Sequence, residues 1–497
     1  MKAFFEDLRT QRIYRIAAGY LVSSWLILQI VALLSSALGL PNWTLKAVLA
    51  LLLVGLGASL IVGWRIDVRA ARLVSAETKR LPRRTHLIFL PIATLFIVVG
   101  GILIFSVFLD VNQAAKPADW ALQSSGQATG SGTPIPDIAL PDGTHVSLGA
   151  QEVLAGDNDL GLRSLASNGL AVIENRPGHI RFLAAAGFST YLLEGTDFKH
   201  LNAAPRLVFG PGDPGEFDNG GAQAFAALRT GSSLFAFYQA EDLENLPTNA
   251  ALGVSGFFLS IGVAESDDDG KTWVKKGQIV RSEKPKEWAL DMHQGGRGIG
   301  LPGGVADKNG KLFYLYYTNL STPQGGTAGQ ISVARCSLEE GPPLPGNWKK
   351  YYKGDFTEPG LGGKETPVID VYSSGHAGAR YGRPTYANSL GKYVMVFNLT
   401  QATEWEEDVA PQNSGIYVAT SDDLIKWSPR VKLVSNYGQR VLGKPLAVAP
   451  TLVFDPGDKA SGWMIYAYSA KLATTKTSGV GTPTYMVGRR ISFTEGR

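Results

Sequence analysis

The sequence predicts an all-β domain behind an α-helical membrane anchor, and three observations lead to this prediction. Three long apolar runs stand within the first 110 of the 497 residues. Residues 160–497 instead show short apolar and aromatic stretches separated by Gly, Asn, Asp and Pro, a pattern typical of strands and turns. These strand-like stretches also recur at similar intervals. The only cysteine, Cys336, falls in one of them and excludes an intrachain disulfide, so the fold depends on packing.

The three apolar runs predict a membrane anchor of three transmembrane helices. They cover residues 16–40, 47–64 and 87–109, and about 20 apolar residues span a bilayer as a helix. Basic residues gather before the first run and between the second and third, so the positive-inside rule places these segments in the cytoplasm. A cleaved signal peptide is the alternative for the first run, which is long for one. We expect a multi-pass protein of a bacterial-type cytoplasmic membrane, with the lipid bilayer as a partner and the C-terminal domain periplasmic or extracellular.

Composition and charge divide the chain into three parts. These are an anchor at 1–110, a flexible linker at 111–137 that is rich in Gly, Ser, Ala and Pro, and a folded domain at 138–497. The anchor carries 12 basic and 5 acidic side chains, whereas the rest of the chain carries 35 basic and 38 acidic ones. The net charge of +4 therefore comes from the anchor and gives no support for a nucleic-acid partner.

Four glycine-led stretches repeat within the predicted domain. They begin at Gly231, Gly310, Gly391 and Gly462, which are 79, 81 and 71 residues apart, and each continues as an apolar and aromatic run. A second run of the type Ile-x-Val-Ala follows the first three, and a weaker copy of the unit lies at 179–200. Five such units predict a five-bladed β-propeller, in which each sheet is buried only by its neighbours. The alternative is a β-sandwich whose internal similarity is accidental.

Two turns after these runs carry a motif. Ser266-Asp-Asp-Asp-Gly-Lys-Thr-Trp273 matches the Asp-box of sialidases and related propellers, and we expect Asp268 to accept main-chain amides, Gly270 to adopt positive φ and the tryptophan to pack between blades. Ser421-Asp-Asp-Leu-Ile-Lys-Trp427, together with the glycine-led strands, resembles the blade hairpins of five-bladed glycoside hydrolases of the arabinanase, β-xylosidase and invertase-like superfamily. This resemblance covers about residues 160–497 and implies action on furanosides or related sugars.

Three acids are candidates for the catalytic carboxylates that the resemblance implies. Glycosidic bonds are cleaved between two acids, one that protonates the leaving oxygen and one that activates water or attacks the sugar. Asp218, Asp291 and Glu365 each precede a predicted inner strand, where the superfamily holds its catalytic groups. We expect Asp218 to act as base or nucleophile, Glu365 as acid, and Asp291 to orient its partner. The alternative for each is a turn residue or a solvated loop carboxylate.

Basic and aromatic side chains gather near the same positions and are candidates for substrate binding. Arginine can fork onto a carboxylate or hydrogen-bond sugar hydroxyls, and an aromatic ring can stack on a sugar face. The alternative is that the arginines pair with the acids and brace the ring. The candidates are His293, Arg297, His376, Arg383, Trp405 and Arg440.

The sequence predicts no cofactor. It lacks a nucleotide-binding glycine loop, a zinc ligand spacing and an EF-hand loop, and a structural cation in the central channel has no motif behind it.

These features together favour a membrane-anchored glycoside hydrolase that acts outside the cytoplasmic membrane on a furanose-containing or related surface polysaccharide. One alternative is a sialidase-like hydrolase of acidic sugars, in which Arg297, Arg383 and Arg440 hold the substrate carboxylate. The other is a non-catalytic propeller that binds a glycan or a protein, because propellers host many unrelated functions.

Overall fold

The computed structural model describes most of residues 134–496 and a few residues between Tyr20 and Leu56. No helix among the described residues is long and apolar enough to cross a membrane. The predicted spans lie almost entirely outside the described residues. The chain separates into two compact units, Met1–Pro117 and Ala118–Arg497, and all the described strands belong to the second. The internal segments left out of the description are 157–158, 163–164, 166–168, 203, 245, 247–255, 292–295, 322–328, 370–376, 402–413, 437–445, 458–459 and 470–483.

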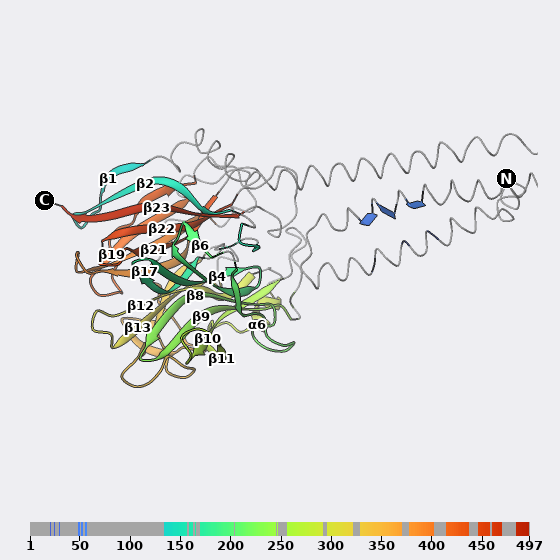
Figure 1. The fold of residues 1–497 in the computed structure, drawn as a ribbon. Coiled ribbons are helices and arrows are strands. Elements are labelled where there is room, and N and C mark those ends of the chain that lie inside the picture. Colours follow the sequence, from blue (N-terminus) through green and yellow to red (C-terminus); the bar gives the residue numbers. More distant parts are fainter. Residues whose placement is uncertain are drawn as a thin grey trace, which may run out of the picture. The chain divides into compact units, whose positions relative to one another are not determined.

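The described strands form four sheets, the largest of which has nine strands (Figure 1). Two groups of antiparallel strands make up this largest sheet and are joined by a short parallel pairing, so we divide the strands into five blades. Blade I contains β3 (Leu170–Arg176), β4 (His179–Ala186), β5 (Ser189–Asp197), β6 (His200–Leu201) and β7 (Arg206–Phe209). Blade II contains β8 (Gly221–Thr230), β9 (Ser233–Asp242), β10 (Phe257–Ser266) and β11 (Val274–Val280). Blade III contains β12 (Gly296–Ala306), β13 (Leu312–Asn319), β14 (Gln330–Ser337), β15 (Lys349–Tyr352) and β16 (Asp355–Pro359). Blade IV contains β17 (Ala377–Ala387), β18 (Lys392–Gln401), β19 (Gly415–Ser421) and β20 (Val431–Ser435).

Blade V combines the two ends of the domain. Its strands are β21 (Leu446–Phe454), β22 (Ser461–Ser469), β23 (Thr484–Glu495), β2 (Thr144–Ala155) and β1 (Ile135–Ala139). β2 pairs antiparallel with the C-terminal strand β23, so the first and last strands of the domain share one sheet. β1 begins three residues before the predicted domain boundary at 138, because Ile135 and Ile138 pack against the core.

The repeat seen in the sequence corresponds to equivalent strands. The four glycine-led stretches become β9, β13, β18 and β22, the second strand of their blades. The Ile-x-Val-Ala runs become the third strands β10, β14 and β19. Cys336 is buried in β14, as expected.

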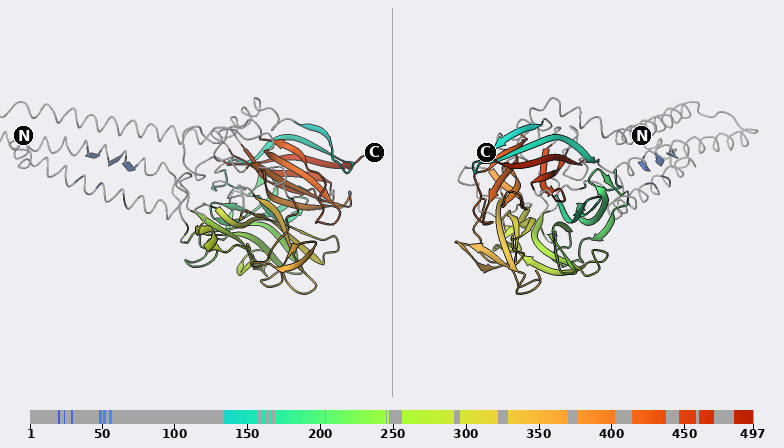
Figure 2. Two further views of the ribbon diagram at one scale, coloured as in Figure 1. Left: turned by 180° about the vertical axis from the view of Figure 1, so that it is seen from behind. Right: turned by 60° about the vertical axis from the view of Figure 1, so that its left-hand side comes forward.

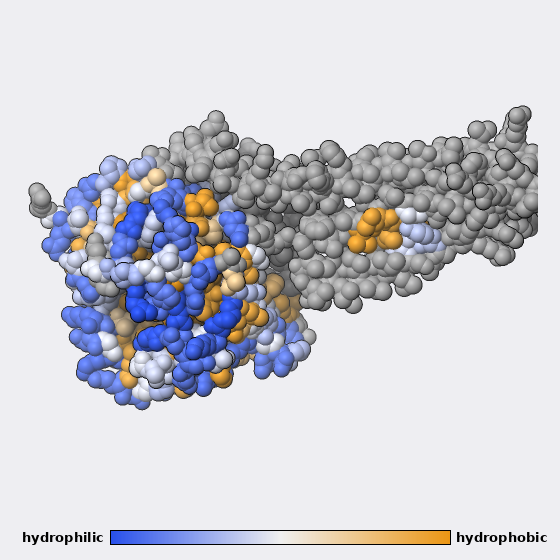
Figure 3. Space-filling view, in the orientation of Figure 1, coloured by the Kyte–Doolittle hydropathy of each residue, from blue (hydrophilic) through white to orange (hydrophobic). Residues whose placement is uncertain are grey.

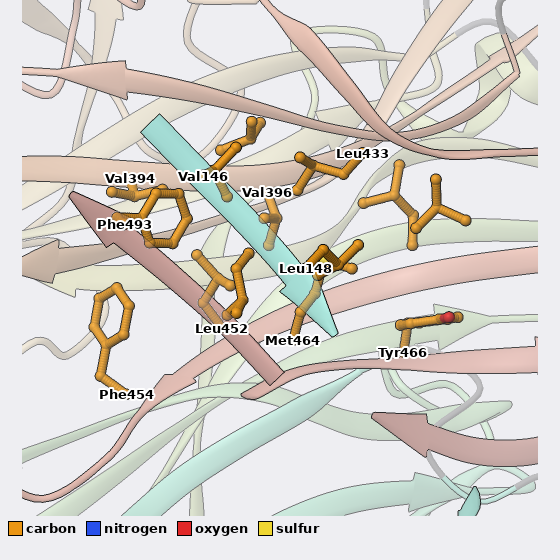
Figure 4. Close-up of a cluster of buried hydrophobic side chains, with 14 of the residues drawn as sticks. Val146, Leu148, Val394, Val396, Leu433, Leu452, Phe454, Met464, Tyr466 and Phe493 are labelled. Atoms are coloured by element: carbon orange, nitrogen blue, oxygen red, sulfur yellow. The ribbon is translucent and has the colours of Figure 1, made fainter. Parts of the chain in front are cut away.

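The hydrophobic core lies between neighbouring blades. Its largest cluster joins blades IV and V, where Val394 and Val396 of β18 pack with Val146, Leu148 and Met464 (Figure 4). Smaller clusters fill the other interfaces. Each blade thus buries both faces of its second strand against neighbours, which is why these strands are almost continuously apolar.

The innermost strand of each blade lies next to the innermost strand of the following one. Contacts join β3 to β8, β8 to β12, β12 to β17 and β17 to β21. The ring is closed by the Leu170 amide of β3, which donates to Thr451 Oγ1 of β21 at 3.4 Å. The right-hand view of Figure 2 shows the sheets around this common centre, which we call the hub.

A bulge recurs in three inner strands and directs their side chains at the hub. Leu301, Tyr381 and Ala449 occupy equivalent bulges in β12, β17 and β21 with φ of 55°, 58° and 57°. A left-handed conformation is unfavourable for such residues, so three repetitions indicate that hub packing imposes it. Leu301 and Tyr381 pack there with Phe225 and Ala185.

The domain has two ends that differ in what they carry. Inner strands begin at the end that we call the N-face, where second strands end and third strands begin, since neighbours in a blade run antiparallel. The opposite end, the C-face, carries the turns between the third and fourth strands. The predicted catalytic residues belong to the N-face.

Candidate functional site

Six of the nine predicted site residues have no described side chain. His293, His376, Trp405 and Arg440 lie outside the described residues. For the other two only the backbone is described: Asp291 ends the short helix α6 (Lys286–Asp291), and Arg297 lies near the start of β12. The roles of all six stay predictions.

Asp218 is buried in an ion pair. Its side chain is 1% exposed, and Oδ2 lies 2.7 Å from Lys275 Nζ and accepts a hydrogen bond from the Tyr238 hydroxyl at 3.1 Å. These partners come from β11 and β9, not from an inner strand. The ammonium also lies 5.9 Å from the centre of the tyrosine ring. Burial, and then the adjacent carboxylate, raise the pKa of Tyr238, which therefore remains a donor.

Glu365 has the same kind of surroundings in blade III. Its Oε2 accepts from the Tyr317 hydroxyl and from Lys350 Nζ, both at 2.9 Å, and Oε1 accepts from Asn319 at 2.6 Å. Lys350 is fully buried, and it lies 5.7 Å from the centre of the Tyr317 ring.

The two carboxylates occupy matching positions of the repeat. Tyr238 and Tyr317 each lie seven residues after the leading glycine of their unit, and the lysines lie on the fourth strands β11 and β15. Each group of tyrosine, carboxylate and lysine joins strands of a single blade. Asp218 and Glu365 do not contact each other through any of these hydrogen bonds or ion pairs. The structure therefore does not bring Asp218 and Glu365 together as a directly interacting pair.

We expect Asp218→Asn to lower the free energy of unfolding by about 1–3 kcal/mol, because it leaves the Lys275 ammonium without its counter-ion inside the blade. Chemical denaturation measures the change, and Asp355→Asn, at an exposed aspartate in blade III, is the control. An unchanged stability together with lost glycan cleavage would instead support the catalytic role predicted from the sequence.

Arg383 lies in the hub. Its side chain is buried, and Nη1 donates to the Phe225 carbonyl of β8 at 2.5 Å and to the Leu170 carbonyl of β3 at 3.4 Å. Burial lowers the pKa of Arg383 to about 10, so the guanidinium stays charged at neutral pH. One side chain of β17 thus joins the inner strands of three blades. The sequence left open that the arginines brace the ring by pairing with acids. Arg383 does join several blades, but it binds main-chain carbonyls and not acids.

A carboxylate that the sequence did not single out lies at the N-face. Glu241 is near the end of β9, where it pairs with Gly221, the first residue of β8. Its Oε1 accepts a hydrogen bond from Gln239 Nε2 at 2.8 Å. Burial raises the pKa of Glu241 to about 6, and the bond from Gln239 opposes this only in part.

Two glutamines connect this acid to the neighbouring blades. Gln239 Oε1 accepts from the Leu301 amide of β12 at 3.1 Å, and Gln223 Nε2 donates to the Gly187 carbonyl of blade I. Buried polar chains of this kind hold their members in fixed orientations. The sequence carried a signal for Glu241, the alternating polar residues of Tyr238-Gln-Ala-Glu241. This acid lies at the end of a second strand, whereas the catalytic acids were expected before inner strands.

An exposed aromatic ring also lies at the N-face. Phe188 occupies the tight turn between β4 and β5 and is 50% exposed. Its carbonyl accepts the Ala222 amide of β8 at 2.9 Å, so the turn is fixed beside the start of that strand. A rigid exposed ring offers a surface on which a sugar can stack.

Comparison with solved structures finds distant similarity. An α-L-arabinofuranosidase from Lactobacillus brevis is 14% identical with a TM-score of 0.42, and the alignment covers 67% of this chain and 92% of that one. An endo-arabinase from Bacteroides thetaiotaomicron is 12% identical with a TM-score of 0.37, covering 67% and 96%. An N-acetylgalactosamine deacetylase from F. plautii is 12% identical with a TM-score of 0.39, covering 73% and 94%.

No protein-family model matches the sequence, and no curated protein matches it. Similarity at this level does not indicate an activity, which has to be argued from the residues.

Proposed function

We propose that the propeller is a glycoside hydrolase domain that cleaves a furanose-containing polysaccharide at its N-face. The observation that carries the proposal is Glu241, a carboxyl group with a pKa of about 6 beside the start of an inner strand. Glycosidases need one carboxylic acid that is still protonated near neutral pH, and burial is the usual means of obtaining it. Glu241 then protonates the leaving oxygen.

The second carboxylate in this proposal is Asp291. The helix α6 that ends at this residue is fixed to the neighbourhood of Glu241, because Lys286 Nζ donates to Asp242 Oδ1 at 2.6 Å. Asp218 and Glu365, each engaged by a lysine and a tyrosine, position the blades around the site. Phe188 supports a sugar ring at the rim.

Product analysis tests the proposal. The purified chain is incubated with arabinan and with a sialylated glycan, and released saccharides are separated by size. We expect products from the neutral arabinose-containing polymer. Products from the acidic substrate alone would support the sialidase-like alternative.

A glycan-binding propeller without catalysis is the second candidate function. It is favoured by the engagement of two of the three sequence-predicted acids in buried ion pairs. Calorimetric binding of arabinan oligosaccharides without any product would support it and contradict the hydrolase.

We also propose that residues 1–110 tether this domain to the outer side of a cytoplasmic membrane, a proposal supported by the three apolar runs and the arginines between them. In cell fractionation we expect the chain in the membrane pellet, released by detergent but not by 1 M salt. Release by salt would contradict the tether.

A further inference from the structure

A crevice of about 550 Å³ lies on the C-face, at the opposite end of the domain from the proposed catalytic site. Blade I supplies one wall through β4, β5 and β7, and the turn between β10 and β11 of blade II supplies the other. Its volume falls within the range of small-ligand sites, about 300–1,000 Å³. The lining residues are His179, Arg181, Glu194, Arg206, Asp269 and Lys271.

The turn that forms one wall is held rigidly. Asp268 accepts hydrogen bonds from the Thr272 amide at 2.8 Å and from its hydroxyl at 2.6 Å, and Gly270 has φ of 82°. Trp273 packs edge-on against Phe209 of blade I, with ring centres 6.4 Å apart. Asp268, Gly270 and Trp273 thus each have the contact or conformation expected of them. The two crevice residues of this turn, Asp269 and Lys271, therefore have a fixed backbone.

Both carboxylates of the crevice lie in ion pairs with Arg181, which also lies 3.3 Å from Glu174. Asp269 Oδ2 accepts from Arg181 at 2.9 Å and Oδ1 accepts from Arg229 at 2.6 Å. Glu194 lies 3.2 Å from the same Arg181.

Two cationic side chains of the crevice, Arg206 and Lys271, have no ion pair with a carboxylate among the described residues. The guanidinium of Arg206 donates hydrogen bonds to two main-chain carbonyls, that of Gly270 at 2.6 Å and that of Lys271 at 2.5 Å. The ammonium of Lys271 is exposed and has no ion-pair partner among the described residues. The crevice thus combines a fixed wall with a small excess of positive charge. Arg181, Arg206 and Lys271 face the two carboxylates of Glu194 and Asp269, so these five residues carry a formal net charge of +1.

We propose that this crevice binds the anionic group, a carboxylate or phosphate, of an acidic saccharide. Guanidinium and ammonium groups are the usual ligands of such oxyanions, and the polar lining suits a hydroxylated molecule. Most of the coloured surface of the domain in Figure 3 is hydrophilic, with hydrophobic residues scattered over it.

Calorimetry on the purified full chain tests this site with three probes: trigalacturonic acid, the neutral trisaccharide maltotriose, and inorganic phosphate. We expect trigalacturonic acid to bind, maltotriose to bind at least 10-fold more weakly, and phosphate to compete only at much higher concentration. Lys271→Glu should weaken binding of the acidic trisaccharide at least 10-fold. Lys349→Gln, at an exposed lysine of blade III, should leave it unchanged.

Equal binding by Lys271→Glu and wild type would overturn the proposal, as would equal affinity for the neutral trisaccharide. Phosphate that binds as tightly as the trisaccharide would overturn its assignment to a saccharide. Thermal unfolding of Lys271→Glu should match wild type, since the side chain makes no ion pair within the described residues. Failure of this proposal can be told apart from failure of the proposed hydrolase, because binding of the acidic trisaccharide tests the C-face and arabinan cleavage tests the N-face.

Discussion

Arg383→Met is expected to lower the free energy of unfolding by about 2–4 kcal/mol. The substitution keeps an apolar chain in the hub but removes the charged donor shared by the carbonyls of Phe225 and Leu170. Hydrogen bonds from charged groups contribute about 1.5–3 kcal/mol, and carbonyls left buried without a donor add a desolvation cost. The loss falls on contacts that join blades I, II and IV, so the whole domain should unfold more readily. Urea denaturation followed by tryptophan fluorescence measures it.

Arg430→Met is the matched control for the hub variant. Arg430 is exposed before β20, and we expect a change within about 0.5 kcal/mol. An equal fall in the free energy of unfolding of the two variants would mean that the hub contacts of Arg383 do not stabilise the domain. Unchanged stability with weakened glycan binding would support the substrate-binding role that the sequence predicts for Arg383.

The blade architecture could be predicted because its strongest signal is local. Second strands such as β9 and β13 are buried on both faces, so they appear as apolar runs behind a turn glycine. The turn at 266–273 was equally readable, because the hydrogen bonds that shape it, from the Gly270 amide to Ser266 and from the Thr272 amide to Asp268, lie within eight residues. Closure of the ring by β2 and β23 has no such signal, since the two strands are more than 300 residues apart.

The candidate site could be predicted only in part, because its geometry depends on which strand ends meet. Asp218 precedes an inner strand as expected, yet its carboxylate is bound by β9 and β11. Glu241 reaches the N-face from the end of a second strand, a position that only the antiparallel pairing with β8 reveals. Arg383 lies within the inner strand β17 and not before it, and the carbonyls that it binds belong to distant segments.

Glu241→Gln should reduce the rate constant for arabinan cleavage by about 100- to 10,000-fold, the usual contribution of a general acid. The amide keeps the shape of the side chain and can still accept the hydrogen bond from Gln239, but it cannot transfer a proton to the leaving oxygen. KM should stay within a few-fold of wild type. Because the acid must be protonated, wild-type kcat should fall as the pH rises through about 6.

The same substitution should stabilise the domain above pH 6, which distinguishes a carboxyl group with a raised pKa from an ordinary surface one. Burial raises the pKa of Glu241 from 4.5 to about 6, so the folded chain holds more protons than the unfolded chain in this interval. Stability therefore falls as the pH rises from about 4.5 to above 6, by on the order of 1–2 kcal/mol. The Glu241→Gln variant lacks this loss and should be the more stable protein at pH 7.5.

Glu244→Gln, at an exposed glutamate nearby in the sequence, is the control and should alter neither the activity nor the pH dependence of stability. Full activity in Glu241→Gln would remove this residue from the mechanism, and an unchanged pH dependence of stability would contradict the raised pKa of its carboxyl group.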